Sequence, residues 1–244
     1  MEPRSPGAAR AGDRLRGVAV AAGVAAGIVG GVTEDFEDGT RSPSLVLPTP
    51  WAFGIWGPIY AGAVGYATHT ARPSRRTDPL LRRTGWPVAL AYALAGLWVR
   101  VPGPPRRQLP AIAGTVAAAA TAYQRAAPRR GEADGAAEAW LVRVPLALFA
   151  GWVTVAAAAG TTEVVIGEGY ADLPPGRTPW AVAVVGLAGG VATWVTRRHP
   201  VSPAYPAAVA WGLGTAAVRA LPRRRLPGMA ALLAAGAVAA AARR

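Results

Sequence analysis

Long runs of apolar residues alternate with short polar segments along the whole chain. Eight apolar stretches can be distinguished, over residues 17–32, 51–70, 86–101, 109–124, 140–161, 180–196, 204–220 and 227–242. A helix needs about 20 apolar residues to cross a bilayer, with a range of about 17–25, and several stretches are near the lower limit. The pattern predicts an all-α, polytopic membrane helix bundle. The predicted number of spans is eight if the last stretch crosses the membrane and seven if it does not. That stretch is mostly alanine, which is only weakly apolar.

The first stretch carries Gly23, Gly27 and Gly31 at four-residue spacing. These glycines share one helical face, where another helix can approach closely. Small-residue faces of this kind also favour a homodimer. Because the stretch follows a basic N-terminal segment, a cleaved signal peptide is an alternative interpretation.

Composition changes the picture through its charge. Only 16% of the residues are charged, against about 25% in soluble domains, yet the net charge is +13. All basic residues are arginines, and they lie in the gaps between apolar runs rather than on one face, which argues against a nucleic-acid partner. An N-terminus on the inside places sixteen arginines inside and nine outside, which is the bias expected of a membrane protein. The arginines at 219–225 fall outside and contradict this bias.

Several kinds of chemistry find no support in the chain. It has no cysteine, and the spacing of its two histidines gives no metal-ligand pattern. There is no phosphate-binding loop with a lysine and no nucleophile elbow, so no catalytic residues are predicted. The predicted spans also contain no acidic residue, which argues against a proton-driven pump. The sequence therefore predicts neither an enzyme nor a metal protein.

The second apolar stretch opens with an aromatic pattern. Phe53, Trp56 and Tyr60 are spaced i, i+3, i+7 and therefore share one helical face. Gly54 and Pro58 loosen or kink the same turns. Such a face either packs against other helices or forms a flat apolar wall for a ligand.

The fifth stretch has a second face of this kind. Pro145, Phe149, Trp152 and Ala156 are spaced i, i+4, i+7, i+11. Arg143 lies one turn inside the inner boundary of the same stretch. A charged residue in a span usually has a function, and the alternative is that its side chain extends to the interface.

These two patterns carry a family resemblance. The run from Pro48 to Tyr60, followed by Trp140-Leu-Val-Arg-Val-Pro and Gly151-Trp-Val-Thr-Val-Ala, resembles the tryptophan-rich sensory proteins. These are bacterial relatives of the mitochondrial translocator protein (the TspO/MBR family). The later spans resemble a longer, divergent branch of that family with extra C-terminal helices.

The resemblance implies a five-helix membrane core over residues 17–161, which binds tetrapyrroles or other flat apolar ligands near the first loop. Residues 1–16 would form a cytoplasmic tail, and residues 162–244 would add about two or three C-terminal spans and a basic tail. The implied ligand-binding residues are Trp51, Phe53, Trp56, Tyr60, Trp98, Arg143, Phe149, Trp152 and Ala156. Two departures concern polar groups: Ala95 and Gly160 stand where the family commonly has Asn.

The leading functional hypothesis is a receptor or sensor in the bacterial inner membrane, with a cytoplasmic N-terminus. It would need no cofactor, would have the lipid bilayer and a small apolar ligand as partners, and would bind a porphyrin or haem by aromatic stacking. Outer arginines such as Arg100 would pair with the carboxylates of the ligand. The alternatives are a transporter of a small apolar or amphipathic solute, and a structural membrane protein whose aromatic faces only pack helices.

Overall fold

The computed structural model describes residues 11–32, 45–102, 104–129 and 135–243. Within these ranges a helix occupies each of the eight predicted stretches and no strand occurs, which confirms the all-α prediction. The helices are α1 (Ala11–Val32), α2 (Trp56–Ala71), α3 (Pro79–Trp98), α4 (Leu109–Arg125), α6 (Val144–Gly167), α7 (Arg177–Arg198), α8 (Ala204–Ala220) and α9 (Arg225–Ala241). The N-terminal arginines Arg4 and Arg10 and the acidic residues at 34–38 lie outside the described residues.

Shorter elements connect these helices. A single turn, α5 (Ala136–Glu138), and the π-helical η5 (Ala139–Arg143) continue directly into α6. The 3₁₀-helices are η2 (Pro50–Ile55), η3 (Pro73–Arg75), η4 (Pro105–Gln108) and η6 (Tyr170–Asp172).

Three helical segments in the described ranges are long and apolar enough to cross a membrane: Ala11–Val32, Ala136–Gly167 and Arg177–Arg198. Helix α9 is a shorter apolar helix. Helices α2, α3, α4 and α8 do not meet this requirement, because they are short or rich in weakly apolar and polar residues. A 17-residue helix such as α4 or α8 measures about 25 Å, against a hydrocarbon core of about 30 Å.

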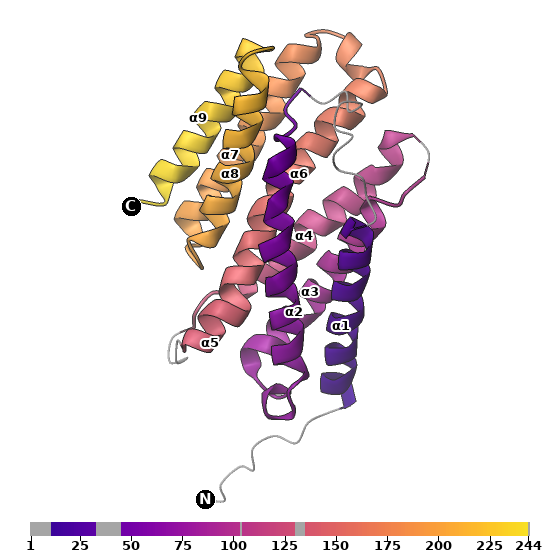
Figure 1. The fold of residues 1–244 in the computed structure, drawn as a ribbon, viewed down its shortest axis with the longest axis vertical. Coiled ribbons are helices and arrows are strands. Elements are labelled where there is room, and N and C mark those ends of the chain that lie inside the picture. Colours follow the sequence, from indigo (N-terminus) through magenta and orange to yellow (C-terminus); the bar gives the residue numbers. More distant parts are fainter. Residues whose placement is uncertain (1–10, 33–44, 103, 130–134, 244) are drawn as a thin grey trace, which may run out of the picture.

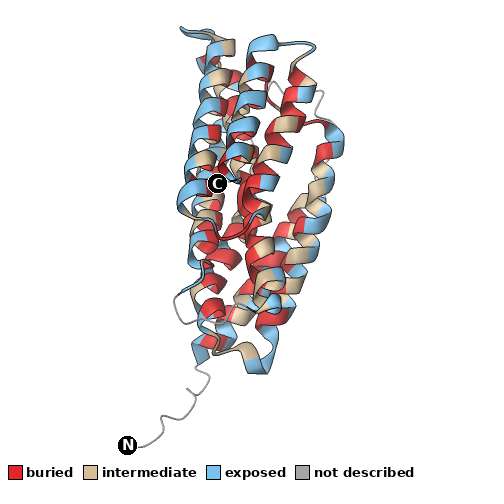
Figure 2. Ribbon diagram, turned by 90° about the vertical axis from the view of Figure 1, so that its left-hand side faces the viewer, coloured by how far each residue is buried: buried red, intermediate tan, exposed pale blue. Residues whose placement is uncertain are grey.

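Helices that follow one another in the chain alternate in direction, and α6 runs through the middle of the bundle (Figure 1). On one side α4 contacts α6, α3 contacts α4, and α1 contacts α3; on the other side α7 and α8 contact α6, and α9 covers both. Buried residues line the inner faces, whereas outward faces are exposed (Figure 2). Exposed apolar residues such as Leu187 on α7 and Leu233 on α9 are what a lipid environment requires.

Glycines allow α1 and α3 to approach closely, as their spacing predicts. A Cβ added at Gly23 would lie 2.3 Å from the carbonyl oxygen of Ala89, and one at Gly30 would lie 2.5 Å from the Cα of Gly96. Gly31, which was expected on the same face, instead faces Tyr60 of α2. The chain therefore uses this glycine face internally, and a homodimer through small-residue faces stays a prediction.

A buried ion-pair group joins the N-terminal ends of the same two helices. Asp13 accepts a hydrogen bond from Arg16 at 2.6 Å and two from Arg82 at 2.9 and 2.6 Å. Asp13 and Arg16 are both almost fully buried. Charge-assisted pairs of this kind are stronger than neutral hydrogen bonds, so they fix the position of α1 along α3.

Prolines inside the helices have visible consequences. Pro87 in α3 has no N–H to donate to the carbonyl of Arg83, and that carbonyl accepts a hydrogen bond from Arg125 of α4 at 3.3 Å. Pro145 likewise cannot donate to the carbonyl of Leu141, and the preceding residues form the π-helical turn η5. Turns of this type often absorb such an interruption.

The helix bounds correct one prediction about acidic residues. The fifth helix continues to Gly167, so the half-buried Glu163 lies inside it rather than in a loop. Asp13 similarly lies in the first turn of α1. Both residues are near a helix end. The apolar pattern marks the hydrophobic centre of a helix and therefore underestimates how far the helix extends beyond it.

An ion pair connects the beginning of α4 with the end of α6. The guanidinium of Arg106 in η4 contacts the carboxylate of Glu168, and the Arg106 backbone N–H donates to the same carboxylate at 3.1 Å. These backbone and side-chain hydrogen bonds hold the pKa of Glu168 below its usual range.

Candidate ligand-binding site

The aromatic pattern at the start of the second helix adopts two kinds of helix. Phe53 belongs to η2, and the α-helix begins only at Trp56. In a 3₁₀-helix, side chains at i and i+3 are eclipsed, so Phe53 and Trp56 remain on one side. Trp56 stacks on Tyr60 with ring centroids 5.1 Å apart. The prediction of one aromatic face is confirmed, although its first turn is not α-helical.

Helix α6 supplies the opposite side of the site. Trp152 and Phe149 are almost fully buried. The ring of Trp152 meets Phe53 and Trp56 edge to face, with centroid distances of 5.6 and 6.2 Å. Phe149 lies 6.3 Å from Trp56. The structure therefore brings together five of the predicted residues, which are Phe53, Trp56, Tyr60, Phe149 and Trp152.

A sixth aromatic residue, Tyr92 of α3, was not predicted. Its ring is parallel to that of Phe149 with a centroid distance of 4.2 Å, and it is fully buried. Gly27 of α1 makes this position possible, because a Cβ there would lie 3.0 Å from the Tyr92 ring. A tyrosine deep in an apolar span was the available signal, since its hydroxyl needs a partner. These six residues are called the aromatic cluster below.

Two buried hydrogen-bonding groups in the aromatic cluster are unsatisfied. The indole Nε1 of Trp152 and the hydroxyl of Tyr92 have no hydrogen-bond partner within the described part of the chain. A buried polar group without a partner costs about 1–3 kcal/mol, and most such groups in proteins are paired. Both can donate a hydrogen bond to an acceptor that a ligand supplies.

Trp51 lies apart from the aromatic cluster. Its side chain is 59% exposed and meets the ring of Trp211 on α8 edge to face at 5.2 Å. This position is typical of a tryptophan at the membrane interface. Its role in ligand binding stays a prediction.

Trp98 instead lies near the beginning of α4 and the C-terminal half of α6. Its indole donates to the side chain of Gln108 at 3.1 Å. A Cβ at Gly160 would lie 2.9 Å from the Trp98 ring and 3.2 Å from Ile112. The absence of a side chain at Gly160, where the family commonly has Asn, therefore leaves room for Trp98.

Ala156 is half-buried on the face of α6 that also carries Trp152.

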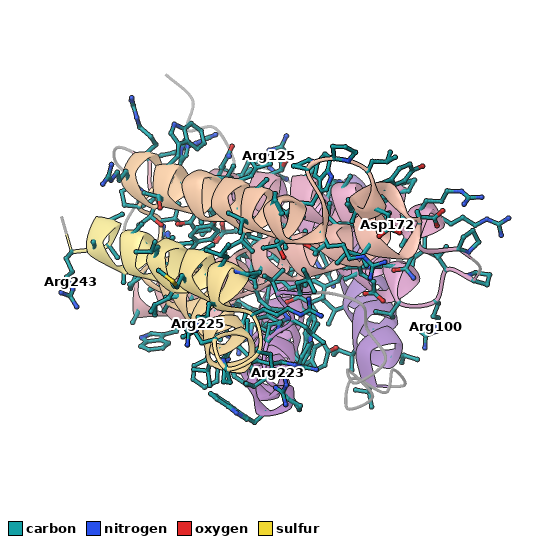
Figure 3. All side chains as sticks on the ribbon, turned by 90° about the horizontal axis from the view of Figure 1, so that it is seen from above. Arg100, Arg125, Asp172, Arg223, Arg225 and Arg243 are labelled. Carbon is teal, nitrogen blue, oxygen red and sulfur yellow. The ribbon has the colours of Figure 1, made fainter. Side chains whose placement is uncertain are left out.

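Arg143 is buried rather than extended to the interface. Its Nε donates to the carbonyl of Ala126, the C-cap residue of α4, at 3.0 Å. It thereby satisfies a terminal carbonyl that the helix itself cannot. Arg100 likewise pairs with a carbonyl near a helix end, because it donates to the carbonyl of Val29 in the last turn of α1 at 2.9 Å. Figure 3 shows Arg100 beside α1, on the side of the bundle away from α9.

No metal centre is apparent in the ranges that the structure describes, where no group of three His, Cys, Asp or Glu side chains could hold an ion. His69 in α2 is fully buried, and its two ring nitrogens have no partner within these ranges. His199 follows α7 and lies edge-on to Trp194 at 5.4 Å.

Comparison with known proteins gives one finding. A family model described as "TSPO-like protein" matches residues 18–243. The match continues through the C-terminal helices α7, α8 and α9, so these helices are included in the family pattern. No curated protein and no solved structure matches the chain. The predicted division at residues 16 and 161 stays a prediction.

Proposed function

Because the chain belongs to the TSPO-like family and is a membrane protein, we propose that it is a receptor or sensor for a flat apolar ligand. The ligand class is a tetrapyrrole, such as a porphyrin or haem, and the site is the aromatic cluster between α2, α3 and α6. The observation that carries this proposal is the pair of buried donors in the aromatic cluster, on Trp152 and Tyr92, which have no partner in the described part of the chain.

The chemistry of the aromatic cluster suits such a ligand. Aromatic pairs contribute about 0.5–1.5 kcal/mol beyond the area they bury, so several rings together favour a planar conjugated molecule. Ligand sites are mostly apolar with a few placed polar groups. A ligand that accepts hydrogen bonds from Trp152 and Tyr92 removes the cost of leaving these donors unpaired. The proposed role is binding, because stacking rings and hydrogen-bond donors are the groups that the aromatic cluster offers to a ligand.

The orientation belongs to the same proposal. The arginine bias favours an N-terminus in the cytoplasm of a bacterium. The beginning of η2 and the end of α3 then face the outside, and the ligand approaches the aromatic cluster from that side.

The test is a titration of detergent-purified protein with protoporphyrin IX, followed by tryptophan fluorescence. The unmodified protein should show saturable quenching of its tryptophan fluorescence. Trp152→Phe keeps most of the ring but removes the donor, and it should weaken binding about five-fold, as expected for one neutral hydrogen bond. Trp140→Phe is the matched control, because Trp140 is 70% exposed and lies outside the aromatic cluster.

Absence of saturable quenching would refute the proposal, and so would equal affinities in the two variants. A structural role is the second candidate, because the parallel contact of Tyr92 with Phe149 also stabilises the bundle without a ligand. That role predicts that Trp56→Ala lowers the unfolding temperature while protoporphyrin IX leaves it unchanged in every variant.

A further inference from the structure

Helix α8 packs directly behind the part of α6 that carries Trp152. A Cβ at Gly151 would lie 2.5 Å from the carbonyl oxygen of Tyr205. One at Gly212 would lie 2.8 Å from the side chain of Val155. Because a glycine on each helix permits this approach, α8 has a closely defined position relative to the α6 side of the aromatic cluster.

The same helix also holds the chain that leads into the other side. The indole of Trp211 donates to the carbonyl of Ala52 at 3.1 Å, and its ring contacts Trp51. In the last turn of α8, Arg219 donates to the carbonyl of Pro48 at 3.1 Å. The positions of these two residues are about 12 Å apart along the helix axis, so α8 holds this part of the chain at two separate points.

The beginning of this segment is anchored by the C-terminal helices as well. Leu45 is buried in a small apolar group with Ile166 of α6, Ala171 of η6 and Ala181 of α7. Residues 45–52, called the outer segment here, are therefore attached at three places to elements later in the chain. The aromatic cluster begins at the next residue, Phe53.

We propose that Trp211 and Arg219 are positioning residues for the ligand site. By holding the outer segment, α8 sets where Phe53 and Trp56 lie relative to Trp152, although neither Trp211 nor Arg219 touches the ligand. The ligand-binding part of this inference rests on the proposed function. Arg219 lies on the side of the membrane that should be poor in positive charge. In this arrangement it holds Pro48 at the outer end of the bundle.

The absence of cysteine from the chain permits a direct test that needs no ligand. Gly54→Cys introduces one thiol in η2, at a position where a Cβ meets nothing within 4 Å. A nitroxide spin label at this thiol reports the mobility of η2 in the full chain. Trp211→Phe and Arg219→Met each remove a donor but keep most of the side chain. Both should shorten the rotational correlation time of the label, and the double variant should shorten it most.

Matched controls separate this effect from general loosening. Trp194→Phe alters an exposed tryptophan of α7, and Arg223→Met alters an exposed arginine after α8; Figure 3 shows Arg223 at the α8–α9 turn. Neither control should change the label at residue 54. A second label at Gly236→Cys on α9, where a Cβ also meets nothing within 4 Å, should be unaffected by Trp211→Phe.

An unchanged label at residue 54, or an equal change at residue 236, would overturn the proposal. Protoporphyrin IX should bind the double variant more weakly than the parent protein, because Phe53 and Trp56 are then no longer held in place relative to Trp152, and equal affinity would also overturn the proposal. If the parent protein binds no porphyrin, the proposed function fails, while the label still decides whether α8 holds the outer segment.

Discussion

Gly23→Ala tests the close contact of α1 with α3. The new Cβ would lie 2.3 Å from the carbonyl oxygen of Ala89 and 2.9 Å from its Cα. Both are backbone atoms, which cannot rotate away as a side chain can. The helices must therefore separate by about 1 Å to restore an ordinary contact of about 3.4 Å. Overpacking of this kind typically costs about 1–3 kcal/mol.

Gly17→Ala is the matched control on the same helix. A Cβ at Gly17 meets nothing within 4 Å, and it gains the same helix propensity, about 1 kcal/mol, as a Cβ at Gly23. The difference between the two variants therefore isolates the packing cost. We expect Gly23→Ala to be less stable than Gly17→Ala by about 1–3 kcal/mol.

The assay is reversible unfolding in mixed micelles with increasing sodium dodecyl sulfate, followed by circular dichroism. Equal free energies of unfolding for the two variants would refute the reasoning, because they would show that α1 does not pack on α3 through this glycine. A more stable Gly23→Ala would refute it more strongly.

Three further predictions concern other contacts. Gly160→Ala should displace the ring of Trp98, which its Cβ would approach to 2.9 Å, and the indole fluorescence maximum should shift to longer wavelength as the ring becomes more exposed; an unchanged spectrum would contradict this. Asp13→Asn should destabilise the protein by about 3–5 kcal/mol, because it leaves a buried arginine without its charged partner, and chemical unfolding measures the loss. The pKa of Glu168 is lowered in the folded protein, so its link to Arg106 contributes stability above the ordinary carboxyl pKa of 4.5 and loses it as the pH falls through the lowered value; unfolding temperatures of Glu168→Gln and the parent should therefore differ at pH 7 and converge at low pH.

The positions of the helices follow from the sequence because apolar runs report the membrane-facing and buried parts of each helix directly. All eight predicted stretches are helices, and their centres are as expected. Helix ends are less predictable, since Asp13 and Glu163 lie in helical turns that the apolar pattern does not reach. Polar residues near an end can stay helical by pairing or by extending toward the interface.

The aromatic cluster was predictable in part for a related reason. Phe53 and Trp56 are close in sequence, so helical geometry alone places them on one side. Trp152 shares a helix with Phe149 and follows the same rule. Tyr92 could not be assigned in this way, because its contact with Phe149 depends on how α3 and α6 are rotated against each other.

The helical character of the chain, its location in a membrane and the residues that share each helical face follow from local periodicity and composition. Which faces meet follows from the folded bundle alone. Trp211 and Arg219 donate to carbonyls that are 159 and 171 residues earlier in the chain, and no pattern along the sequence marks those carbonyls. The physical reason is that the register between helices is set by glycine contacts and hydrogen bonds between distant segments, which exist only once the bundle has formed.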